Sequence, residues 1–85
     1  MLMFVEYDTE YNHRLYSCFS DINELCRELE KHHINDNVMY IDFYIGFDCI
    51  LCYDVKDECF IYYSDIINDR NAAEQIVRTL RKKVK

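Results

Sequence analysis

The chain has 85 residues and a mass of 10.4 kDa, enough for one domain, which we expect to span residues 1–85. An apolar content of 51%, with eight tyrosines and five phenylalanines, excludes a disordered chain. A single glycine and no proline exclude collagen-like sequence, glycine-rich phosphate-binding loops and the nucleophile elbow of hydrolases. The net charge of −6 disfavours direct nucleic-acid binding, because that binding depends on lysines and arginines.

The N-terminal part of the chain predicts a β-hairpin followed by a helix. Leu2–Asp8 and Arg14–Phe19 have strand-like patterns, and the polar stretch Thr9–His13 between them favours a turn. Ser20 is then a candidate N-cap for an amphipathic helix over Asp21–His33. The apolar stripe of this helix has i, i+3, i+4, i+7, i+11 spacing and consists of Ile22, Leu25, Cys26, Leu29 and His33.

Three strand-like runs follow the turn-forming residues 35–37: Val38–Ile45, Phe47–Val55 and Cys59–Tyr63. In the first two runs every odd-numbered position is apolar from residue 39 onward, whereas the even-numbered positions include tyrosines and aspartates. This alternation predicts an antiparallel meander with one buried face. Gly46 lies where a tight reversal is needed, and Lys56–Glu58 forms a short turn.

A second helix is predicted to begin at Asn71, with Glu74 three residues later as in a capping box. Its apolar stripe consists of Ala73, Ile76, Val77, Leu80 and Val84. Bases gather in its last turns, where the helix dipole favours cations: Arg78, Arg81, Lys82, Lys83 and Lys85. The resulting order, ββαβββα, predicts an α+β fold in which one antiparallel sheet of about five strands carries both helices on one face.

The cysteines and histidines do not indicate a catalytic or metal centre. Cys49 and Cys52 have the spacing of a zinc knuckle, with Cys59 and the pair His32–His33 as further candidate ligands. Within a strand, however, positions i and i+3 point to opposite faces, so we expect buried thiols. The histidines fit a helix end, and nothing resembles a Ser/His/Asp or Cys/His order. We therefore expect no metal, no cofactor and no enzyme.

The cellular location follows from the cysteine count and the N-terminus. The five cysteines are an odd number, and no basic segment of a signal peptide precedes them. No apolar run has the length of roughly 20 residues that a membrane span needs. We expect a reducing, cytoplasmic environment and no membrane association.

The second face of the predicted sheet is the strongest candidate for a binding surface. If the helices cover the odd-numbered face of the meander, the other face displays tyrosines and aspartates, with Phe60 and Ile50 among them. Tyrosines are enriched at interfaces, and carboxylates pair with arginines and lysines of a partner. The expected partner-binding residues are Tyr40, Asp42, Tyr44, Asp48, Asp54 and Tyr62. The alternative is a half-solvated sheet, in which tyrosines occur because of their β-propensity.

Charge and residue usage suggest what that partner is. Residues 1–69 carry a charge of −11 and residues 70–85 a charge of +5. An acidic body suits a basic protein, such as a nucleic-acid-binding enzyme or complex. The abundance of residues with AT-rich codons is typical of low-GC bacteria and their phages. We therefore expect a non-catalytic inhibitor of phage anti-defence type, similar in profile to anti-CRISPR proteins and other nucleic-acid mimics, acting in the host cytoplasm.

Three alternatives remain open at the level of the sequence. The first is an immunity protein or antitoxin that neutralises a basic nuclease; residues 19–29 resemble the opening helix of barstar-like inhibitors, although the rest of the chain does not follow that pattern. The second is a small Cys/His metal-binding protein or enzyme. The third is a homodimer through the tyrosine-rich face.

Overall fold

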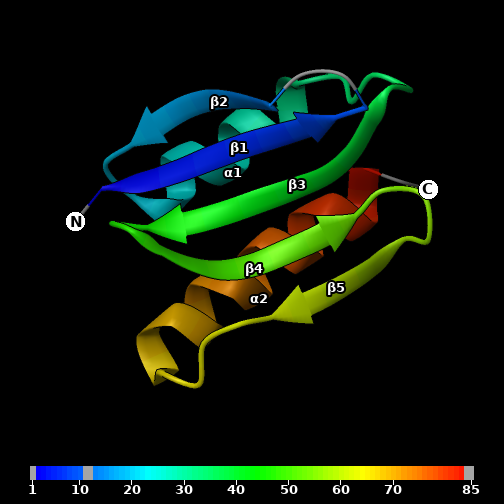
Figure 1. Cartoon of the computed structure of the whole chain (residues 1–85). Helices are drawn as coiled ribbons and strands as arrows, with labels where there is room; N and C mark the ends of the chain where they lie inside the picture. Colours follow the sequence, from blue (N-terminus) through cyan, green and yellow to red (C-terminus); the bar gives the residue numbers. More distant parts are fainter. Residues whose placement is uncertain (1, 11–12, 84–85) are drawn as a thin grey trace.

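The computed structural model describes residues 2–10 and 13–83 and confirms the predicted ββαβββα order. The elements are β1 (Met3–Thr9), β2 (His13–Phe19), α1 (Ile22–Lys31), β3 (Val38–Ile45), β4 (Asp48–Asp54), β5 (Cys59–Tyr62) and α2 (Ile67–Lys83). All five strands form one antiparallel sheet of order β2-β1-β3-β4-β5, and both helices lie side by side against one face of it (Figure 1). No helix of the described residues is long and apolar enough to cross a bilayer.

The chain returns to the middle of the sheet through α1. Both β2 and β3 are antiparallel to β1, one on each side of it, so they run parallel to each other. Parallel strands need a long connection across one face of the sheet, and α1 supplies it. As a result, β1, in which buried apolar residues alternate with outward-facing residues that include two acids, lies directly beside β3.

The core lies between the sheet and the two helices. Inward-pointing strand residues such as Val5, Ile41 and Phe43 meet Leu25 of α1 and Leu80 of α2, and each of these five is at most 1% exposed. Strand positions alternate while helix positions repeat every three or four residues, so the two patterns present matching apolar faces. Burial of these side chains is the dominant favourable term in folding.

The turn between β3 and β4 depends on Gly46, as predicted. Its φ of 61° lies in the left-handed region, where glycine has no steric penalty. Its amide donates a hydrogen bond to the carbonyl of Leu2 at 2.8 Å, which ties the turn to the start of β1. The predicted turn over Thr9–His13 falls partly outside the described residues.

The predicted start of α1 was wrong by one residue. Asp21, not Ser20, is the N-cap, and its carboxylate accepts from the amide of Glu24 at 2.9 Å. Ser20 instead donates through its hydroxyl to the Glu24 side chain at 3.0 Å, so both residues take part in the cap. The helix also ends earlier than predicted, at Lys31, with His32 as the C-cap.

The predicted start of α2 at Asn71 was also wrong, because the helix begins at Ile67. The cap comes from upstream: the Ser64 hydroxyl accepts from the Ile66 amide at 3.3 Å and donates to Asp69 at 2.7 Å. A serine followed by an acid five residues later is not a capping-box spacing, which explains why the local pattern at Asn71 and Glu74 was misleading. Val84 and Lys85 lie outside the described residues.

A β-bulge in β4 changes which residues share a face. Phe43 lies opposite Leu51 and Tyr44 opposite Cys49, so Ile50 is an extra residue between them. Ile50 is therefore 1% exposed and part of the core, although the alternation placed it on the outer face. The same bulge corrects the expectation for the thiols: Cys49 and Cys52 are not on opposite faces but on the same one.

Candidate functional site

The face of the sheet that the helices leave uncovered is the candidate site, and we call it the open face. Cross-strand partners share a face, so the register of β1, β3, β4 and β5 identifies its members. On these four strands it consists of Phe4, Glu6, Asp8, Tyr40, Asp42, Tyr44, Cys49, Cys52, Asp54, Cys59 and Ile61, together with Tyr63 just beyond β5; Cys18 of β2, opposite Phe4, shares the same face.

Three rows of side chains cross the open face from β1 to β4. They are Asp8–Tyr40–Asp54, Glu6–Asp42–Cys52 and Phe4–Tyr44–Cys49. Carboxylates thus occupy both ends of the first row and two neighbouring positions of the second. Tyr40 lies between the two carboxylates of the first row, and Tyr44 lies in the third row, next to the second. This arrangement offers anionic groups and aromatic surface together, which suits arginine and lysine side chains.

The central row places two carboxylates directly opposite each other. Glu6 on β1 faces Asp42 on β3, and like charges in this position repel. Each carboxylate has a donor beside it: the Tyr44 hydroxyl donates to Glu6 at 3.0 Å, and the Cys52 thiol is hydrogen-bonded to Asp42. The two donors fix the carboxylates in place without neutralising their charge.

These donors remain protonated at neutral pH. Burial and the hydrogen bond to Glu6 raise the pKa of Tyr44 above its ordinary value. Burial and the hydrogen bond to Asp42 raise the pKa of Cys52 to about 12, and burial with the charge of Asp42 also raises the pKa of Cys49. A lowered pKa makes a thiol reactive, and the pKa values of Cys49 and Cys52 are shifted in the opposite direction.

One end of the open face is hollowed. The hollow has a volume of about 440 Å³, and its lining residues include Tyr40, Asp36, Asp54 and Asp57. Lys56 is the only base among its lining residues, so the hollow is acidic overall. Its size and charge would admit a basic side chain. We call it the acidic hollow.

Four of the six predicted site residues come together on the open face: Tyr40, Asp42, Tyr44 and Asp54. The other two do not. Asp48 is exposed but lies opposite Ile45, which pairs with Met3 of the core side. The bulge at Ile50 is the cause, because it reverses the face of every residue between it and Gly46.

Tyr62, the sixth predicted residue, faces the helices. It lies opposite Leu51, its hydroxyl donates to Glu74 of α2 at 3.1 Å, and the Arg70 guanidinium lies 4.3 Å from the centre of its ring. Phe60 also points inward and stacks on Tyr53 with ring centres 4.7 Å apart. Across the turn between β4 and β5, even-numbered residues of β4 lie opposite odd-numbered residues of β5. The residues of β5 that share the open face are therefore odd-numbered.

The prediction missed the contribution of β1 to the open face. Phe4, Glu6 and Asp8 alternate with the buried residues of that strand, and this alternation was visible in the sequence. Their position beside β3 was not, because strand order is not encoded locally. The prediction also missed Ile61 and Tyr63, because it assigned the even-numbered residues of β5 to the open face.

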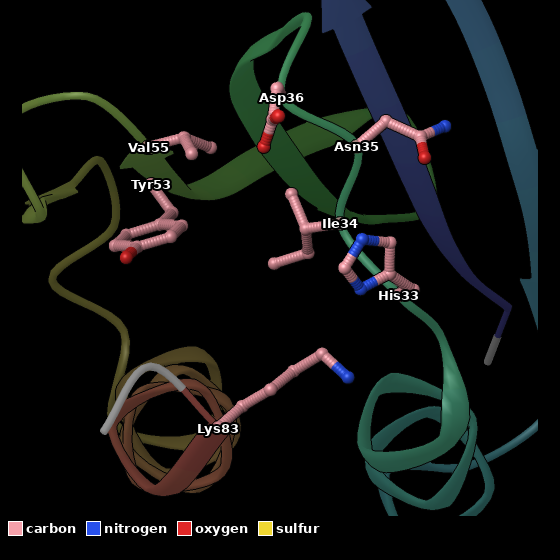
Figure 2. Close-up of a pocket in the computed structure, with 7 residues that line it drawn as sticks. All are labelled: His33, Ile34, Asn35, Asp36, Tyr53, Val55 and Lys83. Atoms are coloured by element: carbon pink, nitrogen blue, oxygen red, sulfur yellow. The ribbon is translucent and has the colours of Figure 1, made fainter.

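A second hollow, of about 410 Å³, lies on the helix side where α1 and α2 end (Figure 2). Figure 2 shows Asp36 and Lys83 on opposite sides of it, with Ile34 between them. The Lys83 ammonium donates to the carbonyl of Glu30 at 3.3 Å, which ties the two helix ends together. The lining residues include His33 but no thiol or serine hydroxyl.

No group of three or more His, Cys, Asp or Glu within residues 2–10 and 13–83 is arranged to hold a metal ion. The bases in the last turn of α2 lie on the helix side of the molecule. Comparisons with protein-family models, curated proteins and solved structures find no match.

Proposed function

We propose that this protein is a non-catalytic inhibitor whose open face binds a basic surface of a nucleic-acid-handling protein. The observation that carries the proposal is the composition of that face. On β1, β3, β4 and β5 its outward positions hold acids, aromatic residues, thiols and one isoleucine, and no lysine or arginine. A half-solvated sheet with no binding role usually mixes both signs of charge.

The central row of carboxylates supports the same proposal. Glu6 and Asp42 face each other at a cost to the free protein, and a cation from a partner would relieve their repulsion. The acidic hollow beside Tyr40 adds a place where a basic side chain can insert next to an aromatic ring. A partner that presents several arginines or lysines is one that otherwise binds phosphates, so the open face would occupy its nucleic-acid site.

We propose a phage anti-defence role as the biological setting, because proteins of that kind are typically small and acidic and come from AT-rich genomes. An immunity protein or antitoxin would use the same surface against a basic nuclease. The identity of the captured partner separates the two settings. A dimer through the open face is disfavoured, because a two-fold axis would pack two acidic faces, both without lysine or arginine on β1, β3, β4 and β5, against each other.

The test compares two single variants, each of which introduces one lysine on a different face of the molecule. Tyr40→Lys places a cation on the open face, and Asn71→Lys places the same cation on an exposed position of α2. Each tagged protein is incubated with nuclease-treated bacterial lysate, and bound proteins are quantified by mass spectrometry across a salt series.

We expect the wild type and Asn71→Lys to retain a basic partner that elutes as salt rises, and Tyr40→Lys to lose it at least tenfold. Added duplex DNA or RNA should displace the retained partner, since both ligands would share one site. Equal retention by the two variants, or a partner that nucleic acid does not displace, would contradict the proposal.

A further inference from the structure

The strand β5 has an unpaired outer edge. It lies at the end of the sheet, and no described strand pairs with its far side (Figure 1). The amide of Tyr63 bonds to Ile50 of β4, so in this antiparallel pair the odd-numbered residues point their backbone groups toward β4. The amide and carbonyl groups of Phe60 and Tyr62 therefore point away from the sheet.

β5 is four residues long, and its sequence carries none of the residues that usually block pairing at an edge. Natural edge strands are usually blunted by lysine, proline or a bulge, and the sequence from Cys59 to Tyr63 contains no proline or charged residue. Four large apolar side chains in the same short segment are also exposed: Ile61 at 43%, Tyr63 at 59%, Ile66 at 65% and Ile67 at 74%. A cluster of this kind beside a free edge indicates an interaction surface.

We propose that β5 pairs antiparallel with β5 of a second copy of this chain, which joins the two sheets into one of ten strands. The outward-pointing groups of Phe60 and Tyr62 set the register, with Phe60 of each copy bonded to Tyr62 of the other. Ile61 then lies on the two-fold axis and faces Ile61 of the second copy. This dimer does not rest on the proposed function, because its backbone hydrogen bonds form along the free edge of β5; of the open face it involves Ile61.

The side chains in this register are self-complementary. On the helix side Phe60 meets Tyr62 of the other copy twice, and aromatic cross-strand pairs are favourable. A two-fold axis perpendicular to the sheet keeps both helical layers on one side.

Net charge determines how salt would act on this dimer. Both copies carry a net charge of −6 and therefore repel each other. Salt screens this repulsion, so dimerisation strengthens as salt rises. Binding of a basic partner by the open face would weaken under the same change, which makes the two associations separable.

The first test is sedimentation velocity of the untagged protein from about 10 µM to about 1 mM, since so small an interface is expected to be weak. Ile61→Lys places two cations together on the axis and should weaken dimerisation at least tenfold. Met39→Lys is the matched control, because Met39 is 44% exposed on β3, away from β5. A wild type that stays monomeric throughout, or equal effects of the two variants, would overturn the proposal.

A cross-linking test fixes the register independently. Facing residues without mutual backbone bonds have Cα atoms about 4.5 Å apart, within the range of disulfides. Ile61→Cys in a Cys52→Ser, Cys59→Ser background, which removes the thiol opposite Ile61 on β4, should cross-link to Ile61→Cys of the other copy when oxidised glutathione accepts the two electrons and is reduced to two glutathione thiols. Met39→Cys in the same background is the control. Cross-linking of Ile61→Cys no faster than of Met39→Cys would reject the register.

Discussion

The opposed carboxylates of the central row predict a variant that is more stable than the natural protein. Glu6→Gln removes one negative charge and keeps the side-chain oxygen that accepts from the Tyr44 hydroxyl. Asp42, on the neighbouring strand, then faces a neutral amide. The variant should therefore unfold less readily than the wild type at neutral pH.

The magnitude follows from the geometry. Directly opposed side chains have Cβ atoms about 4.5–5.5 Å apart, so the two carboxylates are roughly 6 Å apart. Repulsion at that separation is about 0.7 kcal/mol in a solvent-like medium and about 3 kcal/mol at the effective dielectric of a protein surface. Glu6 and Asp42 are both half-buried, and measured cross-strand pairs reach about 1 kcal/mol, so we expect a gain of about 1 kcal/mol.

Urea and thermal unfolding followed by circular dichroism measure the gain. For a domain of this size, 1 kcal/mol corresponds to a rise of about 4–8 °C in Tm. High salt should reduce the difference from the wild type, because salt screens half-buried charges in part. Glu30→Gln, the same chemical change at an exposed position of α1, should stay within about 0.5 kcal/mol of the wild type. A Glu6→Gln protein no more stable than Glu30→Gln at low salt would refute the reasoning.

Two further predictions concern the turn and the thiols. Gly46→Ala should destabilise the protein by about 1 kcal/mol through its φ of 61° alone, since no atom lies within 4 Å of the added Cβ; an unchanged urea midpoint would contradict this. The raised pKa of Cys52, about 12 against an ordinary 9.0, means that the unfolded chain loses a proton above pH 9 that the folded protein keeps. Stability should therefore be unaffected by this group below pH 9 and fall as pH rises from 9 toward 12, and Cys52→Ala should show a shallower fall in urea midpoint over that range.

The gain expected for Glu6→Gln bears on function as well as stability. In the free protein the carboxylates of the open face repel each other, and a cation from a partner would stabilise them. Glu6→Gln removes one of these carboxylates, so it should also weaken capture of a basic partner. Natural binding sites often show this exchange of stability for function. A variant that is more stable and binds less well would link the charge of the open face to its role.

The sequence by itself determined the order of elements and most of the core. Alternation in Val38–Ile45 placed Ile41 and Phe43 inside and Tyr40, Asp42 and Tyr44 outside, because adjacent strand residues point to opposite faces. Gly46 marked its turn because few other residues adopt a positive φ without strain. These features are local, and local sterics and burial are enough to specify them.

The membership of the open face depended on tertiary structure. The extra residue Ile50 and the pairing of β4 with β5 decided that Cys49 and Cys52 point outward and that Asp48 and Tyr62 do not. The placement of β1 beside β3, which brings Glu6 opposite Asp42, depended on the path of α1 across the sheet. Register and strand order come from contacts between segments far apart in sequence, and a shift of one residue exchanges the two faces of a strand.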